Sequence, residues 1–184
     1  LNQDDISRLE KAANEIRQDI IEMLVEAGSG HTAGSLGMAD IFTLLYLEVL
    51  KHDPKNPDWE ERDRLVLSAG HICPVLYAAM AKAGYFPEEE LFTLRKFGSR
   101  LQGHPHRTVL PGIETSSGPL GSGLSQAVGM SLAERMDNVY SSKYVYCITG
   151  DGELNEGQIW EAAMLAGKEK LHNLIVIVLS LIHI

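Results

Sequence analysis

The sequence predicts an α/β protein with a doubly wound parallel sheet, and three observations carry this prediction. Short apolar runs alternate along the chain with longer segments whose apolar residues recur every three or four positions. The runs at 144–148 and 173–178 are joined by a helical segment at about 156–169, which is the spacing of a strand–helix–strand unit with parallel strands. Glycine-containing turns follow the runs at 64–68 and 144–148, where open α/β sheets bind their ligands.

The N-terminal part of the chain is expected to be helical. Residues 3–27 carry apolar side chains at spacings of three and four, which predicts one amphipathic helix that ends at Gly28. The stretch "GSGHTAGSLG" (28–37) is too rich in glycine for the interior of an element, so it predicts a loop. Residues 38–50 are typical of a buried helix, ended by "HDPKNPD".

The middle of the chain begins with a short strand at 64–68. A helix is predicted from about 74 to 83, where Pro74 suits the first turn because it lacks an N–H group. A second short helix is predicted at about 87–96. Residues 97–121 form a long irregular stretch rich in Gly, Pro, Ser and His. Loops of this length in a compact domain are usually functional or disordered, and this one is neither highly charged nor low in complexity. It is therefore predicted to be functional.

The remaining elements complete a single domain over residues 1–184. A helix is predicted from 122 to about 136, followed by the strand at 144–148, the helix at about 156–169 and the strand at 173–178. No internal repeat and no linker divides the chain, and its length suits one core.

Composition excludes two classes of partner. The formal net charge is −9 and the Lys and Arg residues are scattered, which argues against nucleic acid, because neutralising phosphates requires a basic face. No apolar run approaches the roughly 18–20 residues that a membrane span needs. Cys73 and Cys147 lie among apolar neighbours, which favours buried free thiols and a cytoplasmic location.

The stretch "GDGELNEG" (150–157) directly follows the strand at 144–148. Its glycines allow the backbone to approach an anion, and the start of the following helix favours negative charge. A carboxylate at Asp151 beside an anion is explained if a hard cation such as Mg²⁺ bridges the two. A solvated turn, in which Glu153 and Glu156 stabilise the helix N-terminus, explains the same residues, and spacing alone leaves both interpretations open.

Three histidines share a local context. His31, His71 and His104 each follow a glycine in a loop, near a strand end or a helix start. A single histidine of this kind is usually a surface residue, but three predict convergence on one pocket. Imidazoles suit proton transfer near neutral pH and hydrogen bonding to hydroxyls or phosphates. The other histidines lack this context and are treated as background: His52, His106, His172 and His183.

Several stretches together resemble the thiamine-diphosphate-binding half of transketolases. They are "SGHTAGSLGMAD", "LVLSAGH", "GSRLQGHP", "GIETSSGPLGSGLSQAVGMSLAER" and "GDGELNEGQIWEAAMLAG", in the family's order and over almost the whole chain. The last is the most specific, because transketolases continue Gly-Asp-Gly into a helix of the pattern E-G-x-x-W/S-E-A. The compact spacing is similar to the N-terminal subunit of split transketolases, whose other half is a separate chain.

The resemblance implies a cofactor site. Asp151 would ligate Mg²⁺ (or Ca²⁺), Gly152 would contact the diphosphate through its backbone, and His71 would meet the diphosphate or the reactive part of the cofactor. The segment implied to line the cofactor's rings is Gly118, Pro119 and Leu120. The fold implied is the doubly wound parallel sheet of thiamine-diphosphate-binding domains.

The resemblance also implies a reaction and partners. A two-carbon ketol unit would pass from a ketose phosphate to an aldose phosphate, with the cofactor as electron sink. His31 and His104 would contact the sugar hydroxyls and assist proton transfer. Glu156 would link paired active sites across a dimer, so a homo-oligomer is expected. The glutamate that activates the cofactor comes from a C-terminal transketolase half, so this chain alone is expected to be catalytically incomplete.

The pattern breaks near the C-terminus. The strand at 173–178 should run into Asp-Asn-Asn, whose second Asn is a metal ligand in the family, but Leu181 stands there. Residues 179–184 are therefore expected to be a non-native tail, the fold to be incomplete at this end, and cofactor binding by this chain to be weak or absent. Two alternatives remain: another thiamine-diphosphate enzyme (a deoxyxylulose-phosphate synthase or a dehydrogenase E1 component), which "NEGQIWEA" disfavours, and a non-catalytic paralogue, which Leu181 favours.

Overall fold

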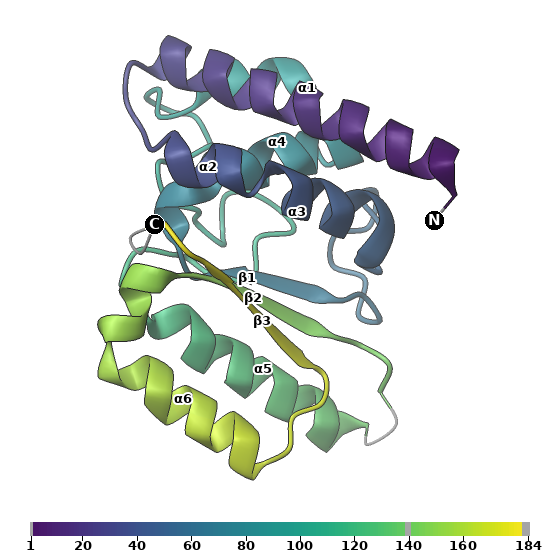
Figure 1. Cartoon of the computed structure of the whole chain (residues 1–184), viewed down its shortest axis with the longest axis vertical. Helices are drawn as coiled ribbons and strands as arrows, with labels where there is room; N and C mark the ends of the chain where they lie inside the picture. Colours follow the sequence, from purple (N-terminus) through teal and green to yellow (C-terminus); the bar gives the residue numbers. More distant parts are fainter. Residues whose placement is uncertain (1, 139–140, 182–184) are drawn as a thin grey trace.

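A parallel sheet separates two layers of helices in the computed structural model, which describes residues 2–138 and 141–181. In this part of the chain the strands follow the order β1 (Arg64–Leu67), β2 (Val145–Gly150) and β3 (Leu174–Leu179), all parallel. Helices α1 to α4 cover one face of the sheet, and α5 and α6 cover the other (Figure 1). The predicted doubly wound parallel sheet is confirmed.

The sheet lies between two apolar cores because its side chains alternate between its faces. Leu67 of β1 and Ile148 of β2 belong to the larger core, with α1, α3 and α4. Val66 and Cys147, the neighbours of those residues in sequence, belong to the smaller core with α5 and α6. The central strand β2 is therefore buried on both faces, which explains its continuous apolar sequence.

Helix α1 (Gln3–Ala27) confirms the first predicted helix. Its N-terminus has a capping box, in which Asn2 Oδ1 accepts the Asp5 N–H and Asp5 Oδ2 accepts the Asn2 N–H, both at 2.9 Å. At the other end Gly28 takes the left-handed conformation, with φ 63°, and donates its N–H to the Leu24 carbonyl at 3.0 Å. The inward stripe of α1 packs Ile16 and its neighbours into the larger core.

The predicted loop at 28–37 is partly wrong, because α2 (Ala33–Gly37) occupies its second half. Gly34 is needed there for space rather than flexibility. A Cβ at Gly34 would lie 2.6 Å from Ile72 Cγ2, so glycine lets α2 pack directly on the segment that follows β1. The predicted helix at 38–50 is confirmed as α3 (Ala39–Leu44), which continues into a π-helical turn (Leu45–Val49).

Helix α4 (Cys73–Ala83) is confirmed, with Pro74 in its first turn, and a 3₁₀ turn (Gly70–Ile72) precedes it. The predicted helix at 87–96 is a 3₁₀ helix (Glu88–Thr93) instead. Arg95 has a φ of 61°, which no right-handed helix can continue, and its N–H donates to the Leu101 carbonyl at 2.9 Å. Between this turn and α5 the chain is irregular, as predicted.

The C-terminal helices lie on the second face. Helix α5 (Ser122–Asp137) is confirmed, and α6 (Gly157–Lys168) is preceded by a 3₁₀ turn (Asp151–Asn155) that the sequence did not indicate. On β3 the side chains of Val176 and Val178 are exposed.

Residues 179–181, the last that the structure describes, belong to the predicted non-native tail. Strand β3 runs through Leu179, the first residue of that segment, and Leu181 packs beside the larger core. Residues 182–184, which include His183, lie outside the described residues. Whether the segment is native stays a prediction.

Two further predictions concern single features. Cys73 and Cys147 are buried free thiols, as expected. Among the helices of the described residues, none has the length and apolar character that crossing a membrane requires.

The background residue His52 is structural, because its ring bonds to the Tyr46 carbonyl at 2.8 Å and to the Tyr85 hydroxyl at 3.1 Å.

Candidate functional site

The site lies where β1 and β2 end side by side. Leu67 pairs with Ile148 in the parallel register, so the segments that follow both strands emerge at the same edge of the sheet. The segment after β1 leads to His71, and the segment after β2 begins with Asp151. The parallel topology thus brings these two segments, which are far apart in the sequence, to the same edge of the sheet.

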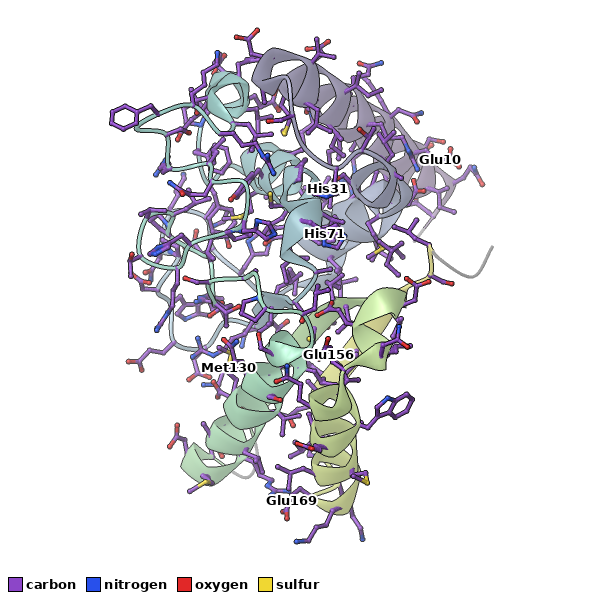
Figure 2. All side chains as sticks on the ribbon, turned by 90° about the vertical axis from the view of Figure 1, so that its left-hand side faces the viewer. Glu10, His31, His71, Met130, Glu156 and Glu169 are labelled. Atoms are coloured by element: carbon purple, nitrogen blue, oxygen red, sulfur yellow. The ribbon has the colours of Figure 1, made fainter. Side chains whose placement is uncertain are left out.

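His31 and His71 lie together, as predicted. Their ring centroids are 5.1 Å apart with an interplanar angle of 68°, and Figure 2 shows both between the upper helices and the sheet. The loop that carries His31 is held by α2, because Ser35 Oγ donates to the His31 carbonyl at 2.9 Å.

His104 reaches the same region through a close approach of backbones at Gly70. A Cβ at Gly70 would lie 2.5 Å from Ser117 Cβ, 2.9 Å from His104 Cδ2 and 3.4 Å from the Gly118 nitrogen. The long loop is fixed to β1 at this point, because Ser117 Oγ donates to the Leu67 carbonyl at 2.5 Å. The three predicted histidines and the start of the Gly118–Leu120 segment are therefore brought together.

Partial burial and neighbouring positive charge lower the pKa of two of these imidazoles, which favours their neutral forms. Burial lowers the pKa of His71 below its usual value, and His31 and His104 lower it further, against a raising effect of Glu153. Burial also lowers the pKa of His104, with Arg95 and His31 acting in the same direction. A neutral imidazole can accept a proton or a hydrogen bond at one nitrogen, which is the form that proton transfer from a hydroxyl requires.

Asp151 is buried directly after β2, with 5% of its surface exposed. Its Oδ1 accepts the Gly152 N–H at 3.0 Å, and its Oδ2 accepts the Leu181 N–H at 2.9 Å. Within residues 2–138 and 141–181, no group of three or more His, Cys, Asp or Glu side chains is placed to hold a metal ion.

Glu153 is a residue of the site that the sequence analysis interpreted as a helix-end charge. It is 1% exposed, and its carboxylate accepts hydrogen bonds from Ser68 Oγ at 2.5 Å, the Gly121 N–H at 2.6 Å and the Gly150 N–H at 2.8 Å. Ser68 in turn accepts the Gly123 N–H at 3.2 Å. The sequence around Glu153 gives no signal of this role, because Ser68 and Gly121 are 85 and 32 residues away.

A polar cavity of about 670 Å³ adjoins His104. Two cations that the sequence analysis missed, Arg95 and Lys96, line it, and so does His106, which was treated as background. Ser29 and Ser117 add hydroxyls to its wall. A cavity with this lining suits a hydroxylated or anionic small molecule.

Glu156 lies apart from the histidines, at the start of α6 (Figure 2). Its side chain is exposed, and its Cβ would be 2.9 Å from a Cβ added to Gly121. The neighbouring Gln158 amide donates to the Leu120 carbonyl at 3.1 Å, so α6 supports the end of the Gly118–Leu120 segment.

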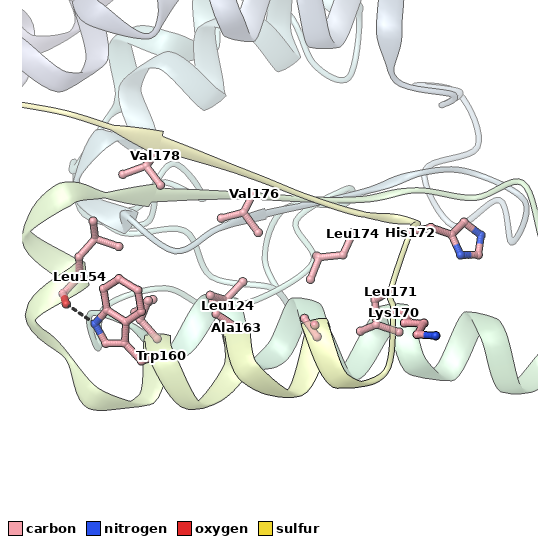
Figure 3. Close-up of a pocket in the computed structure, with 13 residues that line it drawn as sticks. Leu124, Leu154, Trp160, Ala163, Lys170, Leu171, His172, Leu174, Val176 and Val178 are labelled. Atoms are coloured by element: carbon pink, nitrogen blue, oxygen red, sulfur yellow. Dashed lines mark hydrogen bonds between the residues drawn. The ribbon is translucent and has the colours of Figure 1, made fainter.

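A second, apolar cavity in the described part of the chain lies away from this site. A groove of about 720 Å³ lies between β3, α5 and α6, lined mainly by apolar residues such as Leu124 and Val176 (Figure 3). Trp160 borders it and donates its indole N–H to the Leu154 carbonyl at 2.8 Å. The groove has few polar groups that could fix a small polar ligand, so we assign the chemistry to the strand ends.

Comparison with known proteins identifies the family. The sequence pattern of the transketolase thiamine diphosphate binding domain matches residues 9–180. The chain is 49% identical to a 6-deoxy-6-sulfo-D-fructose transketolase subunit of Clostridium sp. (strain MSTE9), over 91% of the chain and 60% of that relative. It is 44% identical to the chloroplastic transketolase of Spinacia oleracea, over 95% of the chain and 25% of that protein.

The fold agrees. The structure of transketolase from Leishmania mexicana superposes with a TM-score of 0.88 at 41% identity, covering 94% of this chain and 27% of that one. The chain therefore spans 60% of the first of these relatives and about a quarter of the longer transketolases. The matched domain and this superposition, together with the site at the strand ends, show that the chain belongs to the transketolase family. The part of the family that it matches is the thiamine diphosphate binding domain.

Proposed function

We propose that this chain is the cofactor-binding part of an enzyme that transfers a two-carbon ketol unit from a ketose phosphate to an aldose phosphate. The observation that carries the proposal is the meeting of three loop histidines beside the ends of β1 and β2. His31, His71 and His104 come from three separate segments, yet they approach one another around Gly70. Such convergence has no structural necessity, because none of the three fills an apolar core.

The residues present fit thiamine diphosphate with a divalent cation. Asp151 provides a buried carboxylate that would hold Mg²⁺ (or Ca²⁺), and the backbone of Gly152 beside it would contact the diphosphate. The backbone of the Gly118–Leu120 segment lies close to the segment that leads to His71, where the cofactor's rings would rest. When bound, the cofactor supplies an electron sink for breaking and forming a carbon–carbon bond next to a carbonyl.

The histidines would bind the substrate and transfer protons. A neutral His71 and a neutral His104 can accept hydrogen bonds from sugar hydroxyls and take up a proton near neutral pH. The polar cavity beside His104 gives a sugar phosphate a place to lie, with Arg95 and Lys96 on its wall.

Leu181 sets a limit on metal binding. The resemblance expects an asparagine ligand there, but leucine offers no side-chain oxygen, and its backbone N–H already donates to Asp151 Oδ2. We therefore expect weak cofactor binding by these 184 residues alone. Thiamine diphosphate binding with a micromolar Kd that depends on Mg²⁺, measured on this chain by isothermal titration calorimetry, would contradict this. It would also remove the support that Leu181 lends to a non-catalytic paralogue.

We further propose partners for the complete enzyme. A C-terminal transketolase half would supply the activating glutamate, and Glu156, exposed at the start of α6, would face a second copy in a homo-oligomer. Two relatives are named as transketolase subunits, which supports a half carried on a separate chain. The unpaired thiols of Cys73 and Cys147 support a cytoplasmic location.

The test uses the complete gene product assembled with its C-terminal half. Ketol transfer between sugar phosphates is measured with Mg²⁺ and with EDTA, beside calorimetric titration of thiamine diphosphate. We expect activity with Mg²⁺, loss of binding with EDTA, and at least a tenfold weaker affinity in Asp151→Asn. Asp4→Asn, an exposed change on α1, is the matched control and should match the parent. Binding that is unaffected by EDTA and by Asp151→Asn would refute the proposal.

A further inference from the structure

A carboxylate that the cofactor chemistry does not use holds together three separate segments of the site. Glu153 follows β2, Ser68 follows β1, and Gly121 directly precedes α5. One oxygen of Glu153 accepts both the Ser68 hydroxyl and the Gly121 N–H, and its second oxygen accepts the Gly150 N–H. The three donors come from positions spread over more than eighty residues of sequence, so the carboxylate is their common point.

Burying the Glu153 carboxylate costs free energy of folding, which indicates that its hydrogen bonds have a role. Glu153 is 1% exposed and, within the described residues, forms no ion pair with Lys or Arg. Burial of an unpaired carboxylate is strongly unfavourable unless hydrogen bonds compensate it, and here three neutral donors do so. A helix-end charge would need none of this, because an exposed glutamate at the same helix start serves that role as well.

The hydrogen bonds reach the parts of the chain that form the cofactor site. Gly150 directly precedes Asp151, and Gly121 directly follows the Gly118–Leu120 segment. The backbone at Gly121 has a φ of 83°, so its N–H points where few other residues could direct it. The donors on Glu153 thus fix the backbone on both sides of the space where a diphosphate and its rings would lie.

We propose that Glu153 is a positioning residue that sets the distance between the Asp151 turn and the Gly118–Leu120 segment, and so pre-forms the cofactor site before anything binds. This rests on the proposed function for the identity of the ligand. Glu153 itself touches neither substrate nor metal in this proposal. It acts through Gly121, Gly150 and Ser68.

The test compares Glu153→Gln with the parent in the complete gene product assembled with its C-terminal half. Glutamine keeps the shape, but its NH₂ group cannot accept, so one donor must lose its partner. Two quantities are measured: hydrogen exchange of the Gly121 and Gly150 amides without cofactor, and the Kd for thiamine diphosphate with Mg²⁺. We expect faster exchange of at least one of these amides and a Kd raised about tenfold, as for one lost charge-assisted hydrogen bond.

A kinetic comparison separates positioning from catalysis. At saturating thiamine diphosphate the kcat of Glu153→Gln should return to within about threefold of the parent, because the reacting groups are intact. Glu10→Gln, an exposed change on the outer side of α1, is the matched control and should alter none of these quantities (Figure 2). If Glu153→Gln fails to fold, Ser68→Ala, which removes one of the three donors, is measured in the same way.

The outcomes are distinct. Unchanged exchange and an unchanged Kd in a variant whose parent binds the cofactor would overturn the positioning role. A kcat that stays low at saturating cofactor would overturn it too, because Glu153 would then act in the chemistry. A parent that does not bind thiamine diphosphate at all would refute the proposed function, while the exchange measurement would still decide whether Glu153 holds the segments together.

Discussion

Gly70 offers the sharpest test of how the site is assembled, because adding a single methyl group there should disturb three segments. In Gly70→Ala the new Cβ would lie 2.5 Å from Ser117 Cβ and 2.9 Å from His104 Cδ2. Carbon atoms pack best at about 3.5–4.0 Å, so one neighbour has to move by roughly 1 Å. The His104 ring can turn, but Ser117 Cβ can move only with its backbone. Gly70 does not have a positive φ, so the cost is steric.

The expected magnitude follows from overpacking. Forcing one methyl group into a packed site typically costs about 1–3 kcal/mol. For a domain of this size each kcal/mol lowers Tm by about 2–4 °C, so a loss of about 5 °C is expected. The backbone shift at Ser117 also displaces Gly118, so the affinity for thiamine diphosphate should fall together with the stability.

Thermal unfolding of the complete protein, followed by circular dichroism, measures the effect. Gly129→Ala is the matched control, since Gly129 lies within α5 and a Cβ there meets no atom within 4 Å. The same chemical change should stabilise the protein at that position by up to about 1 kcal/mol, because alanine is the better helix former. If Gly70→Ala unfolds at the parent temperature with unchanged cofactor affinity, the close approach of the long loop to the end of β1 is wrong.

Three further predictions concern other parts of the chain. Gly123→Ala should cost about 1–3 kcal/mol in denaturant unfolding, because its Cβ would lie 2.7 Å from the backbone Cα of Ser68; an unchanged midpoint contradicts this packing. Burial, followed by nearby carboxylates, raises the pKa of Asp19 to about 6 from 3.8, so stability falls as pH rises between these values. Asp19→Asn should therefore stabilise the protein at pH 7 by about 1 kcal/mol, discounted for partial exposure, and a loss of stability there would reverse the sign of the argument. Burial raises the pKa of the Cys73 and Cys147 thiols to about 12, so iodoacetamide at pH 8 should modify neither in the folded protein and both after unfolding; fast labelling of the native chain would show that these thiols are accessible.

Periodicity predicted the elements that bury one clear face. Helix α1 has Ile16 and Ile20 on an inward stripe, and β2 has an unbroken apolar run because helices cover both of its sides. The elements that differed from prediction depend on tertiary contacts. Helix α2 forms in a glycine-rich stretch because Gly34 fits against Ile72, and the turn at Glu88–Thr93 stops because Arg95 turns away to pair with the long loop.

The candidate site shows the same division. Gly-Asp-Gly and the Gly-His pairs carry their chemistry in their residue types, so Asp151 and His71 could be named from sequence. Glu153 could not be named from sequence, because its role depends on donors from Ser68 and Gly121. The residues next to Glu153 in the sequence do not indicate these distant partners. A buried and an exposed glutamate look the same in sequence when the group that buries one of them is distant.

The order of the strands in the sheet also has a consequence for how the chain folds. The pairing of β2 with β3 closes a short crossover through α6, whereas the pairing of β1 with β2 encloses α4, the long loop and α5. Closing the longer segment costs more chain entropy, and contacts between distant segments slow folding. The β2–α6–β3 unit is therefore expected to form early, and the meeting of His71 with Asp151 must await the late arrival of β1. The candidate site would then form in the same folding step that completes the sheet.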